Sequence, residues 1–366
     1  MAIRIRAPRN KATAAYVRSL FLNAENEIVH EIMRKRASGY VDYADVATLG
    51  RIRATLQSMV DESWQYVPKM VEKYFYTGEG PAKGYASAWK MQRATPGRIH
   101  LIELLSDNLL GEIGEMATTA YIASQTALAD LATLAGGSVP VVGPMTPGPL
   151  RSAILNMTAA TQAIGESPVK LTDRYLIALQ QSGITAFVDK GGRAWSLRNY
   201  GDMAVRTTSR QAAVAELLTR DDEQDLYMIS SIGSTCPICA PLEGRVYSKS
   251  GTNPNYPPLS LAFGKIDPTG PEDLSNTYLN IHPSCLHSLT PYTELGKTPK
   301  QVERIRNFSN PETNPLDLDP RSKKQIEAYR EKERNRAAYL REFKKKQKAR
   351  LERQMAKAAK ESEATN

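Results

Sequence analysis

The first third of the chain repeats apolar and charged positions with helical spacing. Between residues 12 and 37 apolar side chains recur every three or four positions, at Tyr16, Leu20, Phe21, Ile28, Ile32 and Met33. This spacing predicts an amphipathic helix. A second stripe begins at Val46, with Asp45 as its expected N-cap. Pro68 should kink or end that helix, because proline cannot donate its backbone hydrogen bond.

A third helical run extends from Ile99 to Leu134 and stops at two glycines. Residues 1–135 are therefore predicted to form a helical region whose stripes pack against one another. Glycine and proline then punctuate residues 136–150, which predicts a linker. Residues 151–182 are predicted to form connecting helices.

The pattern changes after residue 182. Apolar residues 186–188 and 194–197 flank Asp189-Lys190-Gly191-Gly192, which predicts two strands joined by a turn. A helix to Thr219 and the β-rich run "DLYMISSIG" follow. Residues 183–295 are thus predicted to form a compact α+β domain. A short helix after Pro299 and a turn-rich stretch make residues 296–320 a predicted linker.

The charge of the chain is concentrated in its last segment. Residues 321–366 contain sixteen Lys or Arg and seven Glu, a net charge of +9 that equals that of the whole 366-residue chain. Residues 1–320 are therefore neutral overall. The segment is rich in strong helix formers, so we predict a basic helical tail that binds a polyanion without sequence preference. Its densest contacts are expected at Lys344, Lys345, Lys346, Lys348, Arg350 and Arg353. The alternative is a solvated terminus without a partner.

All three cysteines lie in two short fragments of the α+β domain. "STCPICAPLEGRVYS" holds Cys236 and Cys239, and "IHPSCLHSLTPY" holds Cys285 between His282 and His287. Thiolate and imidazole are favoured zinc ligands, and C-x₂-C spacing presents two sulfurs from one turn. We predict a structural zinc site made by Cys236, Cys239, His282 and Cys285, with His287 as the alternative ligand.

Forty-two residues separate the two halves of this cluster, more than in common zinc ribbons. Closing such a loop costs about 3 kcal/mol, and structural zinc contributes about 10–16 kcal/mol, so the metal can offset the cost. Three other interpretations stay open: buried hydrophobic cysteines, a redox pair, and catalytic zinc with Glu243 as general base. No catalytic set is predicted, and the near-neutral charge around the cluster does not favour DNA reading by this domain.

Three ordered stretches together resemble a known family: "GITAFVDKGGRAWSLRNYGDMAVRTT", "CPICAPLEGRVYS" and "HPSCLHSLTPY". They are similar to the tailed-bacteriophage minor capsid protein 2 family, which resembles Mu-type head morphogenesis proteins. The resemblance covers about residues 183–293. Mu-type relatives usually end the last motif as H-P-x-C-x-C, whereas this chain has His287 at the final position, so the fourth ligand stays open.

This resemblance implies a structural virion protein in the head interior or at the portal vertex, made in the host bacterial cytoplasm. Its implied partners are the portal protein, the major capsid protein and the double-stranded DNA genome. Some Mu-type relatives carry a C-terminal toxin enzyme, but here that place holds only the basic tail, so no enzyme is expected. The alternatives are a zinc-dependent hydrolase or toxin of a phage or mobile element, and a host nucleic-acid-binding protein. No run of eighteen apolar residues occurs, so no membrane span is expected.

Overall fold

The chain folds into two compact units within the described residues. The computed structural model describes residues 10–37, 46–77, 95–134, 183–188, 194–283 and 285–335, together with 176, 179 and 338. The second unit comprises residues 68–108 and 203–336, and the first comprises the rest. Three helices contribute to both units: α2 (Val46–Thr77), α4 (Pro96–Leu134) and α7 (Leu197–Thr219).

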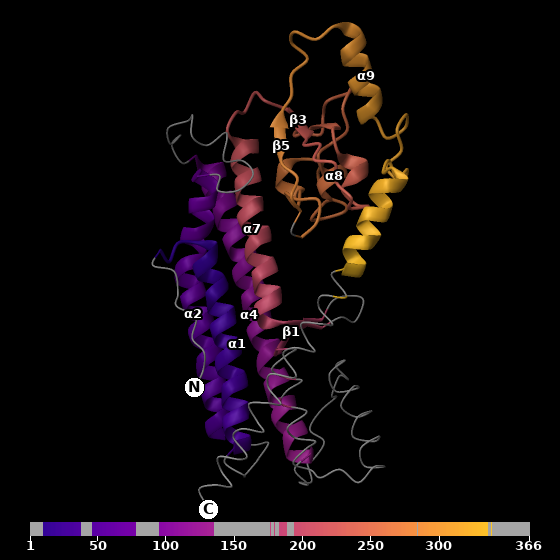
Figure 1. Ribbon diagram of the computed structural model, residues 1–366. Coiled ribbons are helices and arrows are strands. Elements are labelled where there is room, and N and C mark those ends of the chain that lie inside the picture. Colours follow the sequence, from indigo (N-terminus) through magenta and orange to yellow (C-terminus); the bar gives the residue numbers. More distant parts are fainter. Residues whose placement is uncertain are drawn as a thin grey trace, which may run out of the picture. The chain divides into compact units, whose positions relative to one another are not determined.

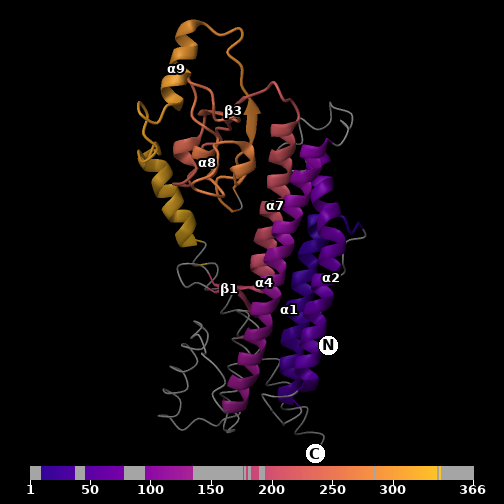
Figure 2. The same ribbon diagram turned by 180° about the vertical axis from the view of Figure 1, so that it is seen from behind.

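The first unit is built mainly from long helices that run side by side (Figures 1 and 2). Helix α1 (Ala14–Ala37) confirms the helix predicted from its apolar stripe. Four side chains of that stripe are buried, and of these Phe21, Ile28 and Ile32 are fully excluded from solvent, while Leu20 and Met33 are partly exposed. The hydroxyl of Tyr16 donates to Glu62 of α2, and Arg53 of α2 lies over the ring of Tyr121 of α4. Helix-on-helix packing therefore accounts for the stripes.

The sequence predicted that Pro68 would kink or end the second helix. Pro68 does not end it. Helix α2 continues through it to Thr77. The residues around the proline explain this result, because Val67, Met70, Val71 and Phe75 are all fully buried. Proline inside a helix costs about 3 kcal/mol, while each buried apolar side chain contributes about 1.5–3 kcal/mol. Burial therefore outweighs the local propensity of Pro68.

A short hairpin and the start of α7 attach to α1 in the first unit. Strand β1 (Thr185–Val188) pairs antiparallel with β2 (Ala194–Ser196), which confirms the predicted pair of strands. Helix α7 follows β2 directly. A Cβ at Gly201 would lie 2.4 Å from the ring of Phe21, so glycine is required for this close approach of α7 to α1.

The second unit contains a three-stranded antiparallel sheet with the order β4-β3-β5. Its strands are β3 (Leu226–Ile229), β4 (Val246–Ser248) and β5 (Leu289–Pro291). The short helical segments η1 (Ala240–Leu242), α8 (Ser260–Phe263) and η2 (Leu274–Asn276) lie in the connections between strands. The core beside the sheet is formed by Val246, Tyr256 and Tyr292. Helices beside small antiparallel sheets confirm the predicted α+β class.

Helix α9 (Pro299–Ser309) is the short helix predicted after the domain. Thr298 caps it in a capping box with Gln301. The helix is attached to the sheet, because the backbone N–H of Val246 in β4 donates to Ser309 Oγ over 2.9 Å. The predicted linker of residues 296–320 therefore packs on the domain through part of its length.

The predicted linker at 136–150 lies outside the described residues. So do the predicted cap Asp45 and most of residues 151–182, of which Leu176 and Leu179 are helical and buried. The division of the chain into domains at the boundaries given above stays a prediction.

Candidate metal centre

The sheet brings the two cysteine fragments together. Strand β3 ends at Ile229, ahead of Cys236, and β5 begins at Leu289, two residues after His287 in the second fragment. The two strands pair, and the N–H of Ser230 extends the pairing by donating to the carbonyl of Ser288 over 2.9 Å. The loop between the fragments is therefore closed by backbone pairing as well as by any metal. The metal therefore does not have to offset the whole entropic cost of closing this loop.

The first fragment forms a tight turn around Cys236 and Cys239. The N–H of Ala240 donates to the Cys236 carbonyl over 3.0 Å, and the N–H of Leu242 donates to the Cys239 carbonyl over 2.9 Å. On the other side, the N–H of Cys236 donates to Ser234 Oγ over 3.1 Å. These bonds hold the backbone so that the two sulfurs face the second fragment.

All five predicted donor residues converge on one place. Cys236, Cys239 and His282 form one group whose ligand atoms lie within 4.8 Å of one another, and Cys239, Cys285 and His287 form another. The sulfur of Cys239 belongs to both groups. It lies 3.8 Å from the sulfur of Cys285 and 2.9 Å from Nε2 of His282.

The separations can be compared with those that a tetrahedral zinc ion requires. Metal–sulfur and metal–nitrogen bonds of about 2.3 and 2.0–2.1 Å place two sulfurs about 3.8 Å apart, and a sulfur and a nitrogen about 3.6 Å apart. The Cys239–Cys285 pair meets the first value. Cys236 to His282 at 3.7 Å and Cys285 to His287 at 3.4 Å approach the second. The 2.9 Å contact between Cys239 and His282 is a hydrogen-bond distance and would have to widen.

Each histidine directs one ring nitrogen at the sulfurs and engages the other elsewhere. Nδ1 of His282 lies 2.8 Å from the carbonyl oxygen of Pro283. Nε2 of His287 lies 2.7 Å from Oε1 of Glu243, and the His287 side chain is 4% exposed. A carbonyl or carboxylate only accepts, so in the neutral rings Nε2 of His282 and Nδ1 of His287 are the nitrogens that can bind a metal. Outer-shell bonds of this kind orient histidine ligands in metal sites.

The surroundings of the cluster shift the pKa values of two of its cysteines. The hydrogen bond from Cys239, aided by His287, lowers the pKa of Cys285, although burial opposes this effect. The same bond to Cys285, together with burial, raises the pKa of Cys239. A thiolate is the form that binds metal, and the lowered pKa of Cys285 favours that form. All three cysteines are free thiols.

Glu243 connects both halves of the cluster through one of its carboxylate oxygens. Its Oε1 accepts from the backbone N–H of Ser234 over 2.9 Å and of Ile232 over 3.2 Å, in addition to His287. Burial raises the pKa of this carboxyl, but the bonds from His287 and the two N–H groups outweigh burial, and the net pKa is lowered. A general base needs a pKa close to the working pH. The lowered pKa of Glu243 therefore does not favour the hydrolase alternative, which required Glu243 to act as a base.

Sequence reasoning found the five donors but missed how Glu243 is used. It also missed Arg321, whose guanidinium donates to the carbonyl of Thr235, next to Cys236, over 2.6 Å. Arg321 lies eighty-six residues from Thr235, and Glu243 lies forty-four residues from His287, so no spacing rule marks either contact. The predicted tail contacts Lys344, Lys345, Lys346, Lys348, Arg350 and Arg353 lie outside the described residues.

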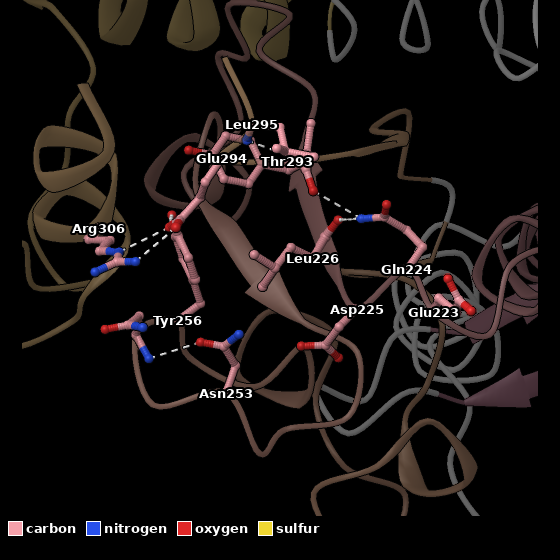
Figure 3. A pocket seen from close by; sticks show the side chains of 12 residues that line it. Glu223, Gln224, Asp225, Leu226, Asn253, Tyr256, Thr293, Glu294, Leu295 and Arg306 are labelled. Carbon is pink, nitrogen blue, oxygen red and sulfur yellow. Dashed lines mark hydrogen bonds and ion pairs between the residues drawn. The ribbon is translucent and has the colours of Figure 1, made fainter. Parts of the chain in front are cut away.

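A separate hollow of about 380 Å³ lies at the edge of the sheet, between β3, β5 and α9 (Figure 3). Two of its carboxylates, those of Glu294 and Asp225, are engaged within the protein. Glu294 accepts two bonds from Arg306 and one from the hydroxyl of Tyr256. Asp225 accepts from Ser248 and Ser250. These bonds attach α9 and the loop after β4 to the sheet, so we assign the hollow a structural role.

Comparison with known proteins supports a phage origin. A structural protein of Lactococcus phage LL-H is 29% identical to this chain over 117 residues, which cover 30% of this chain and 29% of the relative. The chain thus spans less than a third of the length of that relative. No solved structure gives a significant match. In the described part of the chain, no helix has the length and hydropathy needed to cross a bilayer.

The family comparison covers more of the chain. Residues 154–365 match the family described as phage minor capsid protein 2, and this range includes both cysteine fragments and nearly all of the basic tail. The match spans more than half of the chain. This chain belongs to the phage minor capsid protein 2 family and is a structural protein of the phage virion.

Proposed function

We propose that this protein is placed near the portal inside the phage head, where its basic tail contacts packaged DNA. The observation that carries the proposal is the family match over residues 154–365, which covers the cysteine-bearing domain and the tail together. The +9 charge of residues 321–366 against a neutral body supports an anionic partner for the tail. DNA packed in a phage head is the densest such partner available.

The Cys/His cluster is proposed to bind one structural zinc ion. Cys236, Cys239 and Cys285 would supply three ligands, and His282 or His287 the fourth. The donor set is complete without water, which is typical of structural rather than catalytic zinc. When bound, the ion cross-links the segments that precede β5 and follow β3. The domain would then serve as a rigid base from which the tail extends.

Virion location can be tested by cross-linking purified virions and procapsids and identifying the partners by mass spectrometry. We expect cross-links between this protein and the portal or major capsid protein. The absence of the protein from both particles would overturn the proposal. A protein found only in procapsids would restrict its role to assembly.

DNA contact can be tested with paired charge removals in the purified protein. Lys344→Gln with Lys345→Gln should weaken binding to random-sequence duplex DNA and reduce the slope of log K against log[salt] by up to about 0.9 per lost phosphate contact. Lys300→Gln with Arg304→Gln removes the same charge from exposed positions on α9 and is the matched control. Equal losses in the two variants would mean that overall charge, not the tail, governs binding.

A further inference from the structure

The basic tail begins directly at the candidate metal centre. Residues 323–335 are helical. Ser322 and Gln325 form the bonds of a capping box at the start of this helix: the N–H of Gln325 donates to Ser322 Oγ, and the N–H of Ser322 donates to Gln325 Oε1. The cap defines the first turn, so the position of Arg321, immediately before it, determines where the tail helix starts.

Arg321 is held on the turn that carries Cys236. Its guanidinium donates from one nitrogen to the carbonyl of Thr235 over 2.6 Å and from two others to both carboxylate oxygens of Asp319. Its charge also lies over the ring of Tyr329 in the tail helix, 5.6 Å from the centroid. The side chain is 9% exposed. Arg321 therefore connects the metal turn to the tail helix through its own side chain.

The segment that leads to Arg321 is fixed to the same domain. Arg245, a fully buried side chain, donates to the carbonyl of Asn314 over 2.7 Å and to that of Pro241 over 2.6 Å. Pro241 belongs to η1, the turn directly after Cys239. The chain is thus attached to the cysteine turn at Asn314 and again at Arg321. Because the segment is attached at two points seven residues apart, its docking on the domain does not depend on a single surface contact.

The charge of Arg321 is opposite to the net charge expected for a zinc-loaded cluster. Three thiolates and one neutral histidine around Zn²⁺ carry a net charge of −1, and the cation nearest the Cys236 turn in the contacts above is Arg321. The pKa of Arg321 is raised, first by its hydrogen bonds to Asp319 and to a smaller extent by the charge of Cys236. A guanidinium bound to the backbone next to a ligand can both neutralise the centre and hold the ligand turn.

We propose that Arg321 is an outer-shell positioning residue of the metal centre and couples metal loading to docking of the tail helix. This inference rests on the metal binding proposed above. A bound ion would fix the turn that carries Cys236 and with it the Thr235 carbonyl, so Arg321 would dock more tightly. Loss of the metal loosens the turn and releases the start of the tail. Because coupling is reciprocal, docking strengthens metal binding by the same factor.

The experiment measures zinc affinity by chelator competition and docking by hydrogen exchange of amides 323–335, both on the full-length protein. Arg321→Ala should weaken zinc binding about 10–100-fold, the usual cost of losing an outer-shell partner. In the wild type, zinc removal should accelerate exchange in 323–335 by the same factor. Arg330→Ala, which removes an exposed cation from the same helix, is the control and should change neither quantity.

Arg321→Lys separates charge from geometry. A lysine keeps the positive charge but cannot bind both oxygens of Asp319 and the Thr235 carbonyl from one planar group. It should recover part of the zinc affinity while leaving residues 323–335 in fast exchange. This split would not arise if Arg321 only stabilised the fold.

Two results would overturn the inference in distinguishable ways. If the wild type binds zinc and residues 323–335 exchange equally with and without it, the coupling is wrong and the metal centre stands. If the wild type binds no zinc, both the metal centre and the coupling are wrong. Neither result bears on virion location, which the cross-linking experiment tests separately.

Discussion

Oε1 of Glu243 lies 2.7 Å from Nε2 of His287, across forty-four residues of sequence. The same oxygen accepts two backbone N–H groups from the segment that precedes Cys236. One carboxylate therefore joins both halves of the Cys/His cluster. It holds them in place through bonds that do not themselves require an ion.

Glu243→Gln should weaken zinc binding about 10–100-fold. The amide keeps an oxygen for the backbone donors but loses the negative charge that supports His287. Zinc affinity from chelator competition is the measurement, and Glu223→Gln, at the rim of the separate hollow, is the control. Equal affinities in the two variants would show that Glu243 has no part in metal binding.

Purified protein should contain about one zinc ion per chain, as expected for one tetrahedral site. Cys236→Ser and Cys285→Ser should each lose the ion and melt at a lower temperature, because each removes a thiolate that the other ligands cannot replace. Elemental analysis beside thermal unfolding measures both effects. If the wild type is well folded without metal, the cluster is not a zinc site and is only a packed turn.

The two histidines should be partly redundant. His282→Ala and His287→Ala should each retain zinc with reduced affinity, because the other imidazole still lies beside the sulfurs. The double variant should lose the ion. His100→Ala, which alters an exposed histidine on α4, is the control. If one single variant loses as much affinity as the double variant, that histidine is the sole nitrogen ligand.

A buried carboxyl in the helical unit should give the fold a pH dependence. Glu25 is 1% exposed, and burial raises its pKa even though Arg198 lies 3.1 Å from Oε1 and opposes the shift. An acid with a raised folded pKa binds more protons in the folded state than in the unfolded state. Its contribution to stability is therefore lost as pH rises from its unfolded pKa, about 4.3, through the raised folded value.

Glu25→Gln should remove that part of the pH dependence. It retains an oxygen for the N–H of Arg198, which donates to Glu25 over 3.2 Å. Denaturant unfolding of the wild type and the variant between pH 4 and about 7 is the measurement, with Glu103→Gln as an exposed control. Parallel curves for wild type and Glu25→Gln would contradict the assignment.

Gly201→Ala should destabilise the protein by about 1–3 kcal/mol, because the new methyl would collide with the fully buried ring of Phe21. Gly111→Ala is the matched helical control, since no atom lies within 4 Å of its added Cβ. That variant should stabilise the protein by up to about 1 kcal/mol through higher helix propensity. Equal effects of the two substitutions on the free energy of unfolding would exclude a close approach of α7 to α1.

The sequence by itself determined the elements that depend on local spacing. The stripe around Phe21 and Ile28 predicted α1, and the change to short apolar runs predicted β1, β2 and β3. The C-x₂-C pair and the group around Cys285 predicted the candidate metal ligands, because each of these two signals is contained within a few residues. The charge of the tail was equally visible, since charge adds along the sequence without any knowledge of the fold.

Only the tertiary structure decided what depends on contacts between distant segments. Pro68 stays inside α2 because its neighbours are buried, which no local propensity reports. Glu243 contacts His287, forty-four residues away, because β3 and β5 bring the two cysteine fragments together. Arg321 meets Thr235 across eighty-six residues. The physical reason is the same in each case: burial and hydrogen-bond partners set the energy of a side chain, and sequence spacing does not specify either one across a long loop.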